Sequence, residues 1–105
     1  MAVKQKEPLE QLLEEFAGER VHALGRIAAR MERALAELRA FDAGDMEGVE
    51  GEVIARDDLL AVAAESVWFY VVQREAMGWY RHDEALTFYG VPPEVKLRMG
   101  PRRRA

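Results

Sequence analysis

Residues 8–41 carry apolar side chains in steps of three and four, the spacing of one face of an α-helix, with charged residues on the opposite face. Pro8 suits the first helical position, because the amide proton that proline lacks would have no partner there. We therefore predict one long amphipathic helix from Pro8 to about Phe41. Its apolar positions are Leu9, Leu13, Ala17, Val21, Leu24, Ala28, Met31, Leu35 and Leu38.

An acidic segment with three glycines follows over residues 42–56. Gly44, Gly48 and Gly51 lie among carboxylates, which would repel a phosphate, and the spacing of the acids does not match a calcium-binding loop. We interpret 42–56 as an acidic flexible loop within a single domain. The chain is accordingly divided into a disordered N-terminus (1–7), a helical domain (8–100) and a basic tail (101–105).

A second helix is predicted from Asp57, whose carboxylate can cap the first amide groups, to about Gly78. Within it, residues 67–72 are apolar or aromatic on every side. A helix of this composition is normally buried on all sides. One amphipathic helix cannot enclose it, so we expect the C-terminal helices or a second chain to cover the remaining face.

Glycine and proline divide the C-terminal part into two short helices. Gly90 ends the first, over about 81–89, and the second begins at Pro92 or Pro93 and ends near Gly100. The predicted fold class is therefore all-α. A long N-terminal helix packs on an aromatic-rich second helix, two short helices close the C-terminal end, and the whole forms a dimeric helical bundle.

Composition removes several kinds of chemistry. The chain has no cysteine, which excludes a disulfide framework, a thiolate nucleophile and a cysteine zinc site. His22 and His82 do not stand at metal-ligand spacing, and we expect both to be solvated. Ser66 and Thr87 are the only aliphatic hydroxyl residues, and no glycine-rich elbow presents either. We therefore expect no enzymatic activity, no cofactor and no metal.

No apolar run approaches the roughly 20 residues that a membrane-spanning helix needs. The first seven residues are followed by no apolar signal segment. We therefore expect a cytoplasmic protein without a membrane contact.

Three groups of sequence stretches resemble a known family. They are ALGR at 23–26 with LRAFD at 38–42, VW at 67–68 with VVQRE at 71–75, and YGVPPEV at 89–95. Together they resemble an uncharacterised family of small bacterial helical proteins, a domain of unknown function. The resemblance implies the helical fold; it implies no activity and assigns no functional residue.

Length and charge favour self-association. At 1.5 Å per residue the first helix is about 50 Å long and the second about 33 Å, so a third of the first apolar stripe has no partner in the chain. Acids gather in the N-terminal half of the first helix and arginines in its C-terminal half. An antiparallel partner would pair them, although complementing the helix dipole is an alternative explanation. We predict a homodimer that acts in protein interaction or scaffolding. The proposed seam residues are Leu24, Ile27, Met31, Leu35, Trp68 and Val72.

Two alternatives remain open. Arg74 follows the aromatic run and needs a carboxylate or carbonyl partner if buried. An ion pair with Asp83, Glu84 or Glu94 is the structural interpretation. The functional one is an anion-binding pocket among aromatic residues, which are Trp68, Trp79, Tyr80, Phe88 and Tyr89. The other alternative is weak DNA binding by the C-terminal helices. Residues 84–95 partly match a helix-turn-helix, although one residue too many separates Ala85 from Gly90, and Lys96, Arg98 and Arg102 to Arg104 supply positive charge.

Overall fold

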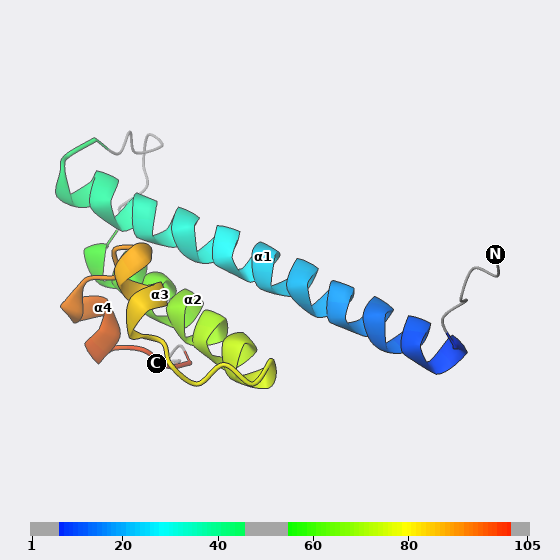
Figure 1. Cartoon of the computed structure of the whole chain (residues 1–105). Helices are drawn as coiled ribbons and strands as arrows, with labels where there is room; N and C mark the ends of the chain where they lie inside the picture. The colour runs from blue at the N-terminus through cyan, green and yellow to red at the C-terminus, as the bar shows by residue number, and fades with distance from the viewer. Residues whose placement is uncertain (1–6, 46–54, 102–105) are drawn as a thin grey trace.

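The computed structural model of the chain describes residues 7–45 and 55–101, and these ranges contain four helices and no strand (Figure 1). In chain order they are α1 (Pro8–Asp42), α2 (Arg56–Ala76), α3 (Asp83–Phe88) and α4 (Pro93–Leu97). The all-α prediction is confirmed, with a long helix packed on a second one. The predictions for 1–6, 46–54 and 102–105, including the centre of the acidic loop, lie outside the described residues.

Helix α1 begins at Pro8, as predicted, and ends one residue beyond Phe41. Its buried side chains all lie in the C-terminal half, because that half forms most of the contact with α2 and the C-terminal segment. They are Ala28, Met31, Ala34, Leu35 and Leu38. The N-terminal part of α1 projects beyond α2 (Figure 1).

Helix α2 does not begin as predicted. The prediction that Asp57 caps it is wrong, because the helix starts at Arg56 and Ala55 occupies the cap position with an extended backbone and no side-chain bond. The carboxylate of Asp57 accepts a hydrogen bond from Arg98 Nη1 instead. The end is as predicted: Met77 caps the helix, and Gly78 follows in the left-handed region with φ 83°.

The core lies between α1 and α2 and is closed by the C-terminal segment. Met31 and Leu35 of α1 and Val67 of α2 are fully buried with Val95 of α4. Full burial of an aliphatic side chain stabilises a fold by about 1.5–3 kcal/mol, so these contacts dominate the packing. The Ser66 hydroxyl, also buried, donates to the carbonyl of Val62 within the same helix at 2.8 Å.

The prediction that residues 67–72 are buried on every side is wrong for one side. Val67 and Tyr70 are buried, whereas Phe69 is 39% exposed and Val72 is 43% exposed. Helix α1 covers one side of α2, and α4 and the ring of Tyr89 cover another. Among the described residues, nothing covers the third side.

Two polar contacts fix the short C-terminal helices. Gly90 ends the turn after α3 with φ 67°, and Arg39 Nη2 donates to the carbonyl of Tyr89 at 2.9 Å. A Cβ added at Gly90 would lie 3.2 Å from Arg39 Nη2. The Tyr89 ring meets the Tyr70 ring edge-on at 5.4 Å, and burial there raises the pKa of Tyr89.

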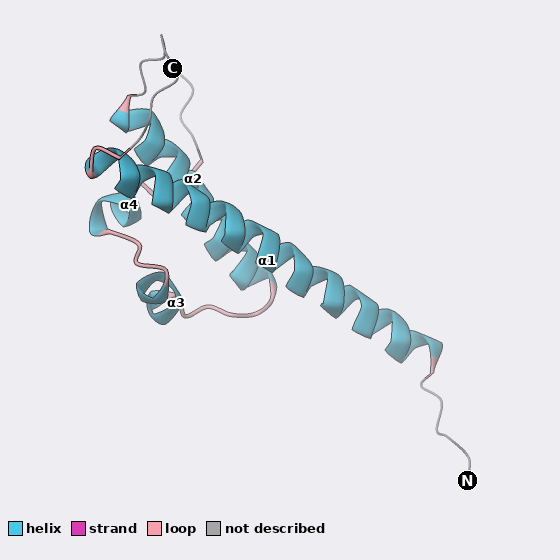
Figure 2. Ribbon diagram, turned by 90° about the horizontal axis from the view of Figure 1, so that it is seen from above, coloured by secondary structure: helices cyan, strands magenta, loops and turns pink. Residues whose placement is uncertain are grey.

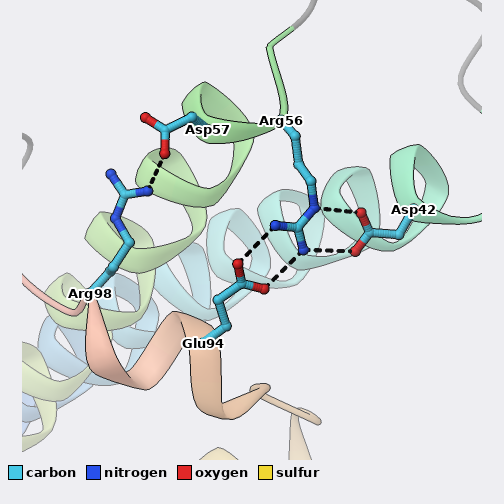
Figure 3. Close-up of polar contacts among 5 residues, drawn as sticks. All are labelled: Asp42, Arg56, Asp57, Glu94 and Arg98. Atoms are coloured by element: carbon cyan, nitrogen blue, oxygen red, sulfur yellow. Dashed lines mark hydrogen bonds and ion pairs between the residues drawn. The ribbon is translucent and has the colours of Figure 1, made fainter.

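Arg56 joins three helices (Figure 3). Its Nε and Nη2 donate to the two carboxylate oxygens of Asp42 at 2.7 and 3.1 Å, and its Nη1 and Nη2 donate to Glu94 at 2.8 and 2.9 Å. These bidentate bonds connect the end of α1, the start of α2 and the start of α4. They lower the pKa of both carboxyl groups and raise that of the guanidinium.

We expect the Arg56 contacts to make stability depend on acidity. Because the folded-state pKa of Asp42 and of Glu94 is lowered, their contribution is present above the usual carboxyl pKa and is lost as the pH falls through the folded value. Arg56→Gln should therefore lower the free energy of unfolding at pH 7 and much less at about pH 2–3. Urea unfolding across this pH range tests it, with Arg33→Gln, an exposed arginine of α1, as control. An unchanged difference at low pH would contradict the assignment.

We expect opposite effects from alanine at two glycines. Gly25 lies in α1. Apart from its chain neighbours and the nearby helix backbone, no atom of the described residues lies within 4 Å of the position its Cβ would take, so Gly25→Ala should stabilise the helix by up to about 1 kcal/mol. Gly90→Ala should destabilise the protein by about 1–2 kcal/mol, since it needs a left-handed backbone and meets Arg39. Urea unfolding curves of both variants at neutral pH measure the two signs.

Candidate interaction surface

We call residues 8–21, the N-terminal part of α1, the overhang. Helix α1 extends past the end of α2 there (Figure 1), and Met77, which caps α2, lines a pocket with Phe16 and Val21 of the overhang. The apolar stripe of α1 continues along it, but its side chains are exposed: Leu9 by 65%, Leu13 by 59% and Phe16 by 52%. Large apolar side chains gathered in this way mark an interaction surface more often than an ordinary surface. The exposed set is Leu9, Leu12, Leu13, Phe16 and Val21.

The overhang is continuous with one side of the α1–α2 pair. Phe16, Ala23 and Arg26 follow one another along α1 at helical spacing, and they line a shallow pocket together with Gln73 of α2. One turn further, the guanidinium of Arg30 lies over the Phe69 ring, 5.8 Å from its centre. We call this side, from Leu12 and Phe16 to Phe69 and Val72, the open face.

Helix α3 lies on the other side of α1. Arg39 contacts the carbonyl that follows α3, and Arg39 stands nine residues, or about two and a half turns, after Arg30. The two arginines therefore point to opposite sides of the helix. Figure 2 shows α3 displaced to one side of α1 and α2. The C-terminal helices thus leave the open face uncovered.

Charge changes sign along the open face. Glu15 and Glu19 are exposed on the overhang. Arg26 and Arg30 are exposed further along α1, on the side of Phe69. Arg30 also approaches Glu65 of α2, at 4.0 Å. The open face therefore combines an acidic end with exposed apolar side chains and an arginine-rich end with Phe69 and Val72.

The six predicted seam residues divide into three groups. Met31 and Leu35 are fully buried within one chain, so they belong to its core and present no surface to a partner. Leu24 and Ile27 are partly buried against that core, and Trp68 is half-buried. Val72 is exposed on the open face.

The seam predicted from the sequence lies too close to the middle of α1. Leu9, Leu13 and Val21 of the overhang belonged to the predicted stripe, but no exposed overhang residue was selected for the seam. The signal that identifies them is the difference in length between the two helices, since apolar positions of α1 beyond the end of α2 have no residue of α2 level with them. The exact limits of the overhang depend on where α2 packs along α1.

Arg74 is held by neutral groups rather than by a carboxylate. Its Nε donates to His82 Nδ1 at 3.2 Å and its Nη2 donates to the carbonyl of Arg81 at 2.8 Å. The predicted ion pairs with Asp83, Glu84 or Glu94 are wrong as its hydrogen-bond partners, because the turn after α2 brings residues 81–82 back to it and Glu94 binds Arg56. The guanidinium also lies over the rings of Tyr70 and Trp79, at 5.8 and 5.4 Å.

His82 differs from its prediction. Its side chain is only 15% exposed, whereas His22 is exposed as expected. Nδ1 accepts from Arg74, so the proton of the neutral ring is on Nε2, which lies 3.1 Å from Glu75 Oε1. Sequence reasoning missed this bridge because residues 74 and 82 are brought together only by the turn at Gly78.

The basic C-terminal residues are partly used inside the protein. Arg98 pairs with Asp57, and α4 is five residues long. Residues 102–104 lie outside the described part of the chain. A recognition helix that enters the DNA major groove normally offers more than one turn.

Two kinds of structural feature are absent from the residues that the structure describes. None of the helices in 7–45 and 55–101 is both long and apolar enough to cross a bilayer. In the same two ranges, no three His, Cys, Asp or Glu side chains are grouped so that they could hold a metal ion.

Comparison with known proteins identifies a family without a known activity. A family model, described as a family of unknown function (DUF6665), matches residues 3–104. No curated protein and no solved structure matches the chain. The match agrees with the resemblance of the sequence to an uncharacterised helical family. Because it spans nearly the whole chain, the protein belongs to the family of unknown function DUF6665.

Proposed function

We propose that this protein is a non-enzymatic helical interaction module that self-associates through the open face. The observation that supports it most directly is the exposure of the apolar overhang. Five large apolar side chains there are between 46% and 65% exposed, in the continuation of a stripe whose other half forms the core. As part of the same proposal, the module acts in the cytoplasm. The chain has no cysteine, which suits a compartment in which disulfides are rare.

The energetic argument is that an exposed stripe of this kind favours association. Burying an exposed apolar side chain gains about 0.025 kcal/mol per Å², or about 1.5–3 kcal/mol for a whole leucine or phenylalanine. Several such side chains, together with Phe69 and Val72, can offset the cost of bringing two chains together, which is of order 4–15 kcal/mol. A partner that covers the overhang also extends the short core of a small domain.

The two other candidate functions have less support. Arg74 uses its Nε and Nη2 on groups of the same chain, and two of the aromatic residues expected around it, Tyr80 and Phe88, are 73% and 81% exposed. An anion bound by Arg74 would therefore compete with existing contacts. DNA binding by the C-terminal helices has only a short helix to offer, in which Val95 is buried.

We expect light scattering across a dilution series to give a dimer of about 24 kDa, twice the chain mass of 11.9 kDa, that dissociates on dilution. Phe16→Glu should shift the equilibrium to monomer, because a charge replaces an apolar contact. Gln11→Glu is the matched control, since Gln11 is an exposed overhang residue about 140° around the helix from Phe16. Circular dichroism should show both variants folded.

A compact monomer at every concentration would contradict self-association. Equal weakening by Phe16→Glu and Gln11→Glu would place the contact elsewhere on the molecule.

A further inference from the structure

We infer that two copies pair antiparallel, with the overhang of each copy lying on the Arg26, Arg30 and Phe69 end of the other copy's open face. The inference rests on the proposed self-association and specifies its partner surface and direction. Such a pairing uses the same surface twice, as a twofold-symmetric dimer does.

Charge complementarity supports the direction. Glu15 and Glu19 stand one turn apart on the overhang, and Arg26 and Arg30 stand one turn apart further along the same face. Side-by-side parallel pairing would place acids against acids and arginines against arginines. Antiparallel pairing places the acids of each copy against the arginines of the other, which lowers the electrostatic cost at both ends.

The positions of these charges in α1 define a register. Glu19 and Arg26 lie equally far from the midpoint between His22 and Ala23, and so do Glu15 and Arg30. A twofold axis that passes this midpoint therefore brings Glu19 level with Arg26 of the other copy, and Glu15 level with its Arg30. Ala23 lines the shallow pocket on the open face, so a small side chain lies where the two copies cross.

The same register aligns the apolar groups. Phe16 comes level with residue 29 of the other copy, next to Arg30, whose guanidinium lies over Phe69. Phe16 of each copy therefore faces the partly exposed Phe69 and Val72 of its partner. In this pairing, the overhang of each copy covers Phe69 and Val72 of the other copy. Both surfaces are left open within a single chain.

A charge exchange between two variants tests the inference. The first variant carries Glu15→Arg and Glu19→Arg, and the second carries Arg26→Glu and Arg30→Glu. Each alone should raise the dimer dissociation constant by about tenfold or more, because like charges meet at both ends. An equimolar mixture should form a heterodimer near the wild-type affinity, because every facing pair is again opposite in sign. Light scattering measures the mean mass of each sample, and native mass spectrometry separates the heterodimer from the two homodimers by mass.

A matched control changes the same number of charges elsewhere on the overhang. Glu10 and Glu14 are exposed acids; Glu10 lies nine residues before Glu19, and so on the opposite side of α1. Glu10→Arg with Glu14→Arg should change the dissociation constant far less than the first variant. High salt should reduce the differences among the charge variants, because exposed charges are screened.

The outcomes separate the inference from the proposed function. If wild type dimerises and Phe16→Glu dissociates it, but the mixture shows no recovery, the self-association stands and the antiparallel register is overturned. A heterodimer much tighter than the wild-type dimer would instead show that like charges face each other in the wild type, as in a parallel pair. Heterodimer recovery to the wild-type affinity and no further, with each variant weakened alone, supports the register.

Discussion

The structure depends on the packing of α2 against one half of α1. Met31, Leu35 and Val67 meet in that contact, and α4 adds Val95 to the same core. Helix α1 is 35 residues long and α2 is 21. One helix therefore buries its apolar stripe over part of its length and exposes it over the remainder. The proposed self-association begins with the side chains beyond the end of that contact, because they have the composition of a core and the exposure of a surface.

The C-terminal segment determines which side of the helix pair stays open. Arg39 holds the carbonyl after α3, Arg56 holds Glu94 at the start of α4, and Arg98 holds Asp57. These contacts direct the short helices to one side of α1 and α2. Most of the groups involved are exposed, so each pair contributes modestly by itself. Together these contacts determine where α3 and α4 lie, and they keep both helices away from Phe69 and Val72.

The repeating apolar pattern was enough to predict the fold class, the limits of α1 and the end of α2, because Pro8, Gly78 and Gly90 mark helix ends by their backbone chemistry. The cap at Asp57 could not be predicted, since that carboxylate is bound by Arg98 from 41 residues away. The partners of Arg74 depend in the same way on a turn that returns His82 to it. Sequence also overestimated the burial of the aromatic run, because the side on which short helices pack is decided by long-range polar contacts. The seam residues mixed core and surface for the same reason.

The Arg56 contact has a consequence for how the chain tolerates change. Asp42 and Arg56 stand at the two ends of the connection between α1 and α2, and their bidentate pair fixes the distance between those ends regardless of what lies between them. The entropy of closing a connection rises slowly with its length, by about 0.6 kcal/mol for each doubling. Insertions between these two anchors should therefore leave the helical pair intact. The connection is a natural place to attach a fluorophore, an epitope or a second domain without disturbing either end of the open face.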